Sequence, residues 1–134
     1  MGERKNNKYR SGNHEKIIAW QMADKLDEMV QEIIKLLPKN EFKLKSQLDA
    51  ASDSVGSNIV EGYYSGSTGE YIRFCKYSRR SCAEVQERLR RIKRKKLIED
   101  EELIEKAIIH SIKTGYIIDR LIRGLEKKKD NIKR

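Results

Sequence analysis

Apolar and small residues recur at alternating spacings of three and four in four segments of this sequence, and few folds can bury such a pattern. The spacing marks one stripe along an α-helix, because a helical turn takes 3.6 residues. It predicts helices over residues 14–37, 42–63, 69–96 and 101–126. No segment alternates with the period of two that indicates a β-strand. The sequence therefore predicts an all-α fold.

Short connections separate the predicted helices. Pro38 ends the first one, because proline disfavours helical geometry in the residue before it, and Gly62 with Gly66 can end the second and form the next turn. Apolar residues make up 37% and charged residues 38% of the chain, a balance that suits amphipathic helices with solvated outer faces. We expect an antiparallel up-down-up-down four-helix bundle.

Local signals refine the helix ends and one crossing. Asn13, Thr68 and Asp100 are placed to cap the first, third and fourth helices, since their side chains can accept hydrogen bonds from free backbone amides. Gly56 lies inside the second helix, where glycine costs about 1 kcal/mol relative to alanine. We interpret it as a sign of a close approach by a neighbouring helix.

The last predicted helix is apolar on more than one face. Its main stripe includes Ile104 and Ile118, and further apolar residues lie off that stripe: Leu103, Ile109, Ile112, Ile117 and Leu121. The outer helix of a monomeric bundle normally has one apolar face. We therefore expect the second face to pack against another subunit, in a homo-oligomer.

The two ends of the chain differ from its centre. Residues 1–12 are polar and basic, and we expect a disordered arm. We set the bundle at residues 13–126 and expect a frayed basic tail over residues 127–134. No apolar run reaches the ~18–20 residues of a membrane span, and no apolar core of a secretory signal is present. These features predict a cytoplasmic protein without a membrane partner.

Residues typical of catalytic or metal sites are sparse. Cys75 and Cys82 lie about 10 Å apart along one predicted helix, too far for a disulfide with each other, and fit reduced, partly buried positions. His14 and His110 lie on different helices without metal-ligand spacing and fit surface or helix-end positions. No phosphate-binding loop or nucleophile motif occurs. We expect no enzyme activity, no metal and no cofactor.

A set of polar residues lies close to the apolar stripes of the second and third helices. Its members are Gln47, Asn58, Glu61, Ser81 and Glu84. Two pairs have a spacing of three and share a helix face, and antiparallel packing would bring the pairs within reach. The set is interpreted as a hydrogen-bond network that fixes helix register. A ligand site between the helices, and plain surface placement, are the alternatives.

The third predicted helix carries a dense basic cluster. Its eleven cations are Arg73, Lys76, Arg79, Arg80, Arg88, Arg90, Arg91, Lys93, Arg94, Lys95 and Lys96. Within this segment only Glu84 and Glu87 oppose them, so its net charge of +9 equals that of the whole chain. A second cluster on the fourth helix comprises Arg120, Arg123, Lys127, Lys128 and Lys129.

Arginine guanidinium groups bind phosphate through paired hydrogen bonds. The clusters therefore indicate binding to a polyanion, with RNA and then cDNA or DNA as candidates, through backbone phosphates and with modest sequence specificity. The alternative is a solvated face that serves solubility, since cations are also favourable at a helix C-terminus.

Parts of the sequence resemble one known family, the four helix bundle proteins, also called 23S rRNA intervening-sequence proteins. The resemblance spans about residues 15–125. It is carried by Ile17-Ile18-Ala19-Trp20-Gln21-Met22-Ala23, by Ser46-Gln47-Leu48 and Asn58-Ile59-Val60-Glu61-Gly62, and by Glu70-Tyr71-Ile72-Arg73-Phe74 with Arg80-Ser81-Cys82-Ala83-Glu84-Val85.

The resemblance implies a ring-shaped homopentamer of helical bundles, with no catalytic residues. It also implies kinship to the accessory variability determinant of diversity-generating retroelements, a basic bundle that binds a reverse transcriptase and nucleic acid. The basic density of residues 79–96 favours this accessory role. The alternative is a bundle encoded in an rRNA intervening sequence that acts as a structural or protein-interaction module.

Overall fold

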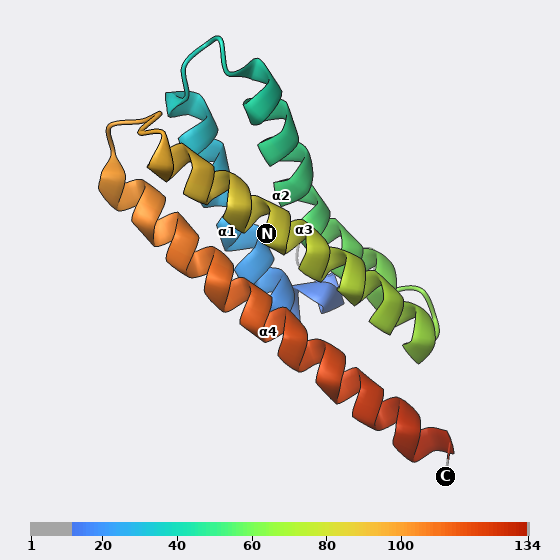
Figure 1. Ribbon diagram of the computed structural model, residues 1–134. Coiled ribbons are helices and arrows are strands. Elements are labelled where there is room, and N and C mark those ends of the chain that lie inside the picture. Colours follow the sequence, from blue (N-terminus) through green and yellow to red (C-terminus); the bar gives the residue numbers. More distant parts are fainter. Residues whose placement is uncertain (1–11, 134) are drawn as a thin grey trace, which may run out of the picture.

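The computed structural model describes residues 12–133 and is helical almost throughout. A short 3-10 helix, η2 (Gly12–Lys16), precedes α1 (Ile18–Leu36), α2 (Phe42–Tyr63), α3 (Thr68–Arg94) and α4 (Glu101–Lys133). Residues 12–133 contain no strand, which confirms the all-α prediction. The α1–α2 and α3–α4 connections lie at one end of the molecule, and the α2–α3 connection lies toward the other (Figure 1).

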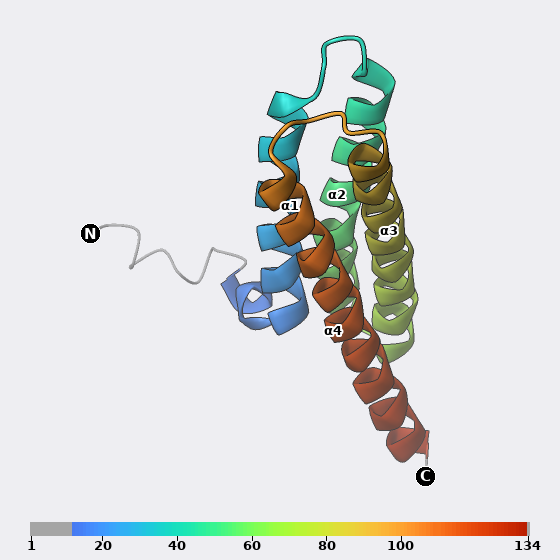
Figure 2. The same ribbon diagram turned by 60° about the vertical axis from the view of Figure 1, so that its left-hand side comes forward.

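The four helices enclose one hydrophobic core. Helices α1 and α3 each pack against both α2 and α4, and Figure 2 shows the helices side by side. The largest fully buried apolar side chains come from all four: Leu26, Val30, Ile33, Leu48, Val55, Ile59, Val85, Leu89, Ile92 and Ile118. Burial of each such side chain stabilises the fold by about 1.5–3 kcal/mol. No helix in residues 12–133 has the length and apolarity of a membrane span.

The start predicted for the first helix is wrong. A helix from His14 capped by Asn13 was expected, but α1 begins at Ile18 because Ile17 is extended (φ −75°, ψ 120°). The His14 ring packs edge-on against Trp20, with 4.9 Å between centroids, and its Nδ1 lies 3.3 Å from the Tyr64 hydroxyl. These contacts hold residues 12–16 in the tighter turn of η2.

The limits of the other three helices agree with the predictions in part. The limits of α2 match the predicted residues 42–63, and Asp100 Oδ1 accepts the Leu103 amide at 3.0 Å, as expected of a cap. The third helix is capped by Ser67 rather than Thr68, because the Ser67 hydroxyl accepts the Glu70 amide at 3.0 Å. Helix α4 continues to Lys133, past the boundary set at residue 126. The arm predicted over residues 1–12 lies, apart from Gly12, outside the described residues.

Two glycines of α2 have different surroundings. Gly62 lies within the helix rather than ending it, and a Cβ atom there would lie 2.9 Å from Phe74 Cβ and 3.1 Å from the Tyr71 carbonyl oxygen. Gly56 does face α1 closely, but a Cβ atom there would meet Ala23 and Trp20 at an ordinary 3.6 Å. Gly66, at φ +88°, forms the α2–α3 turn as expected.

Candidate nucleic-acid interface

The cations predicted on α3 surround a buried stripe. Val85, Leu89 and Ile92 are fully buried, whereas Arg88 is half-buried and the other ten cations of the cluster are exposed. The helix thus presents its basic residues to solvent along its whole length.

Three of the eleven cations are neutralised by acids on α4, outside the basic segment. On the α4 side, Lys76 pairs with Glu126 at 3.6 Å, Arg79 pairs with Asp119 at 2.9 Å, and Lys93 pairs with Glu105. Glu84 and Glu87 are the two acids within residues 73–96, as the sequence shows, but α4 supplies three further acids from outside this segment. These partners lie 12 to 50 residues away in sequence and become neighbours only when α4 packs beside α3.

Three further arginines are paired along α3 itself. Arg88 lies 3.4 Å from Glu84, and Arg94 lies 3.1 Å from Glu87.

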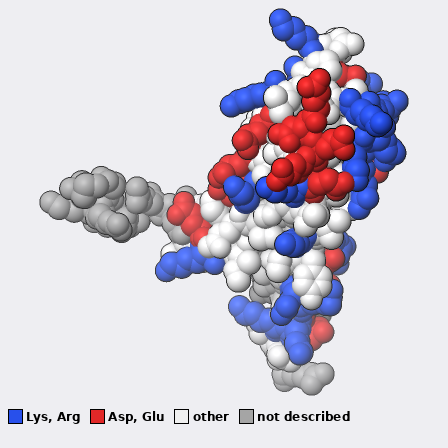
Figure 3. Space-filling model, turned by 90° about the vertical axis from the view of Figure 1, so that its left-hand side faces the viewer, with Lys and Arg blue, Asp and Glu red and all other residues white. Residues whose placement is uncertain are grey.

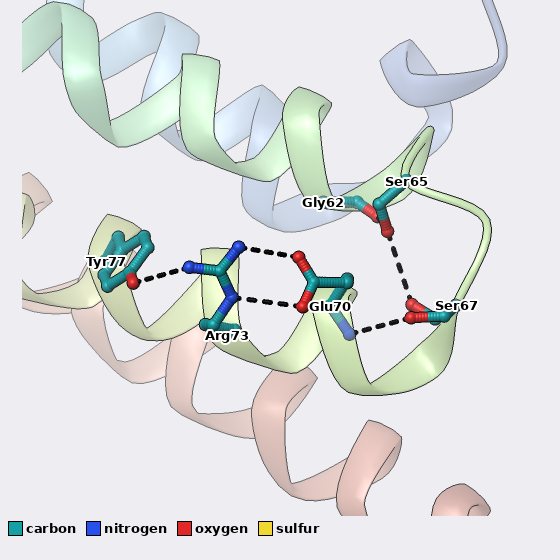
Figure 4. A network of polar contacts seen from close by, with 6 residues as sticks. All are labelled: Gly62, Ser65, Ser67, Glu70, Arg73 and Tyr77. Atoms are coloured by element: carbon teal, nitrogen blue, oxygen red, sulfur yellow. Dashed lines mark hydrogen bonds and ion pairs between the residues drawn. The ribbon is translucent and has the colours of Figure 1, made fainter.

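Arg73 is the most tightly held of the three. It donates to both Glu70 oxygens and, at 2.7 Å, to the Tyr77 hydroxyl (Figure 4). The hydrogen bonds from Arg73 hold the pKa of Glu70 below its usual value. Ser67 caps the same turn by accepting the Glu70 amide, so this arginine belongs to a fixed network at the start of α3.

Five cations of the cluster have no ion-pair partner within residues 12–133. Arg80 lies over the Tyr77 ring, 5.0 Å from its centroid. Arg90, Arg91, Lys95 and Lys96 lie within seven residues at the end of α3, and we refer to these four as the end cluster. All are exposed, so their donors are available to a ligand.

The distribution of charge over the surface is uneven. Figure 3 shows acidic side chains gathered in the half of the molecule that carries the α3–α4 connection, with basic side chains along one edge beside them. A second basic group lies toward the end where α4 stops. The α4 cations Arg120, Arg123, Lys127, Lys128 and Lys129 are all exposed, and Arg120 lies 5.9 Å from the Tyr116 ring centroid.

The predicted polar network is only partly assembled. Asn58 donates to the carbonyl and the hydroxyl of Ser54, both at 2.8 Å, and the Ser54 and Ser81 hydroxyls lie 2.7 Å apart across α2 and α3. Ser54 was not among the predicted members, although it lies four residues before Asn58 on the same face. Glu61 is exposed, Gln47 is half-buried, and Glu84 pairs with Arg88 instead.

The cysteines and histidines lie deeper than expected. Burial raises the pKa of Cys75 to about 12, and burial with the nearby Asp119 charge raises that of Cys82 to about 12. His14 is buried rather than at the surface. His110 is half-buried, with Nε2 2.9 Å from the Met22 carbonyl oxygen. Residues 12–133 contain no group of three potential ligands placed to hold a metal ion.

An acidic hollow of about 220 Å³ lies between α1 and α2. Trp20, Gly56, Asp24, Asp27 and Asp53 line it. Asp27 is satisfied by the Ser52 hydroxyl at 2.7 Å and by Gln31. Its charge is opposite to that of the α3 surface, so the two faces suit different ligands.

A family model and a solved structure both match this chain. The family model described as "23S rRNA-intervening sequence protein" matches residues 15–115. A crystal structure from Bacteroides thetaiotaomicron, of a protein of unknown function from the S23 ribosomal protein family, superposes with a TM-score of 0.71 at 18% identity. The match covers 79% of this chain and 96% of that one. Among curated proteins, none matches this chain.

Proposed function

This chain belongs to the 23S rRNA-intervening sequence protein family, and we propose that it is a non-enzymatic protein that binds RNA, or an RNA/DNA hybrid, through the basic surface of α3. The observation that carries the proposal is the end cluster. Four exposed cations without ion-pair partners in residues 12–133 lie within seven residues. A face that serves solubility alone usually mixes both signs of charge, whereas residues 90–96 contain six cations and no acid, and only Lys93 and Arg94 among them are paired.

The chemistry of these side chains indicates the mode of binding. Guanidinium and ammonium groups bind phosphate oxygens, and such contacts are independent of sequence. Arg80 over Tyr77 and the α4 cations Arg120 and Arg123, which lie nearer the start of α3, are further exposed phosphate donors. Affinity is then governed by counterion release and falls steeply with salt.

The test compares two triple variants of the full chain. One variant replaces Arg90, Arg91 and Lys95 with Gln. The matched control replaces Lys35, Lys39 and Lys43 with Gln; these lysines are exposed at or near the α1–α2 connection. Binding of a structured RNA is measured across a salt titration. The first variant should lose affinity at every salt concentration, and the slope of log K against log salt should fall by about one for each phosphate contact removed. Equal loss in both variants would indicate a general charge effect and refute the proposal.

A narrower form of the proposal is an accessory role beside a reverse transcriptase of a diversity-generating retroelement. In it, the basic surface holds template RNA or its cDNA hybrid while another face contacts the polymerase. The concentration of free cations on one helix supports this form. Co-purification with a reverse transcriptase encoded beside the gene tests it, and absence of such a gene would contradict it.

A second candidate function is a structural or protein-interaction module. The observation in its favour is an apolar stripe on the outer side of α4: Ile109, Ile112 and Tyr116 are 45–56% exposed in the single chain. We propose that a second copy covers this stripe in a homo-oligomer, for which the family resemblance suggests a pentameric ring. The two candidates differ in whether RNA binds at all.

A further inference from the structure

A small hollow lies at the corner where α3 turns into α4. Its volume is about 130 Å³, and its floor consists of the buried side chains of Ile92, Ile98 and Ile104. Lys93, Lys96 and Glu101 form its rim. An apolar cavity of about 150 Å³ accommodates benzene, so this hollow has the size of one six-membered ring.

The backbone at this corner places a lysine where glycine is favoured. Lys96 has φ 52°, and it is the one non-glycine residue in 12–133 with a positive φ. The amides of Lys96 and Leu97 donate to the carbonyls of Lys93 and Ile92, both at 3.1 Å, which closes the C-terminus of α3. An L-residue is strained at such a position relative to glycine, and Lys96 is one of the residues that line the hollow.

The charges around the hollow suit one class of ligand. Lys96 belongs to the end cluster, and Lys95 beside it is also exposed and without an ion-pair partner in the described chain. Lys93 is held in place by Glu105. Glu101 is the one carboxylate on the rim. The corner therefore combines an apolar floor, phosphate donors and a single hydrogen-bond acceptor.

We propose that this hollow binds the base of one unpaired pyrimidine nucleotide, with Lys96 donating to a carbonyl oxygen of the base and Lys95 binding its phosphate. The inference rests on the proposed function and deepens it from phosphate binding to a preferred form of nucleic acid. Lysine ammonium groups can donate to the carbonyl oxygens of the base, and Glu101 can accept from its amino or imino group. A base inside a duplex is stacked and cannot enter, so the ligand carries a loop, bulge or overhang.

The experiment uses three RNA duplexes of identical paired sequence in fluorescence anisotropy titrations. One is blunt, one carries a short uridine overhang and one carries an adenosine overhang of the same length. The uridine overhang should bind on the order of tenfold more tightly than the blunt duplex, and the adenosine overhang should gain little because a purine has two fused rings.

Two variants at one position separate ligand binding from folding. Lys96→Gly and Lys96→Gln both remove the ammonium, but only glycine relieves the backbone strain. Both should abolish the preference for the uridine overhang, and only Lys96→Gly should raise the Tm. The affinity of either variant for the blunt duplex should fall by no more than the loss of one phosphate contact explains.

The experiment distinguishes failure of the base subsite from failure of the proposed RNA binding. Equal binding of all three duplexes by the unmodified protein would overturn the base subsite and leave phosphate binding intact. A uridine preference that survives both variants would overturn its assignment to this corner. If none of the duplexes binds at low salt, both the subsite and the proposed function are wrong.

Discussion

Gly62 of α2 and Phe74 of α3 lie so close that a Cβ atom on the glycine would be 2.9 Å from the Cβ of the phenylalanine. The same Cβ atom would also lie 3.1 Å from the backbone carbonyl oxygen of Tyr71. Because neither a Cβ atom nor a backbone carbonyl can turn aside as a flexible side chain can, α2 and α3 would have to move apart to admit a larger residue.

Replacing Gly62 with Ala should therefore destabilise the protein, by about 1–3 kcal/mol. Gly56→Ala provides a matched control on the same helix. Its Cβ would meet neighbours at 3.6 Å, so the gain in helix propensity should stabilise the fold by up to about 1 kcal/mol. Urea denaturation of both variants measures the two effects, and a shift of the same sign in both would contradict the packing argument.

The hydrogen bond between the Ser54 and Ser81 hydroxyls should contribute to stability rather than to ligand binding. Either serine replaced with Ala should cost about 1 kcal/mol, because the remaining hydroxyl loses its partner across the helices. The double variant should cost less than the two single changes together, which a double-mutant cycle measures. Glu61→Gln, on the exposed side of α2, should be neutral. Unchanged stability in the serine variants would favour the alternative of a ligand site.

The two buried thiols should make the fold sensitive to alkaline pH. Their pKa is about 12 in the folded protein, against an ordinary value near 9.0. A group whose pKa is raised on folding contributes stability that is complete below its unfolded pKa and is lost as pH rises through the folded pKa.

The free energy of unfolding should therefore fall between pH 9 and pH 12, by at most about 1.4 kcal/mol per pH unit for each thiol. A variant with Ala at Cys75 and Cys82 should show a shallower fall, although its stability at neutral pH will be lower. In the native protein at pH 8, both thiols should resist alkylation until denaturant is added. Rapid alkylation without denaturant would show that the thiols are accessible.

The apolar stripe of α4 should control assembly. Light scattering of the unmodified protein should give a mass that is a multiple of the 15.7 kDa chain. Ile112→Lys should lower this mass, because a charged group would be buried in the proposed contact without a partner. Ile132→Lys is the matched control on the same helix, since Ile132 is 69% exposed and lies outside the stripe. A monomeric unmodified protein would exclude the contact.

The helices could be predicted from the sequence because their causes are local. The connection before α2 follows from Pro38, the turn after it follows from Gly66 at φ +88°, and the Asp100 cap follows from a side chain three residues from its partner amide. The start of α1 could not be predicted in this way. It depends on the contact of His14 with Tyr64, fifty residues away, which outweighs the tendency of Asn13 to begin a helix.

The candidate site, like the helices, could be predicted from the sequence only in part. The basic density of α3 is visible in the sequence, but the identity of its free cations is not. Arg79 and Arg80 are adjacent in the chain, and only the packing of α4 shows that Asp119 neutralises the first while the second rests on Tyr77. The left-handed backbone of Lys96 gives no signal in the residue type, because a lysine at a helix end is ordinary.

The last turns of α4 are exposed, and Figure 1 shows this helix extending past the α2–α3 connection. An isolated segment of this length would not form a helix in water, because helix nucleation is unfavourable. Here the packed part of α4 supplies the nucleus, so each further residue needs only one propagation step. The free energy of opening should then decrease gradually from the bundle toward Lys133, and amide hydrogen exchange should accelerate along the same direction. The basic end of the helix can thus unwind residue by residue while the core of the bundle remains folded.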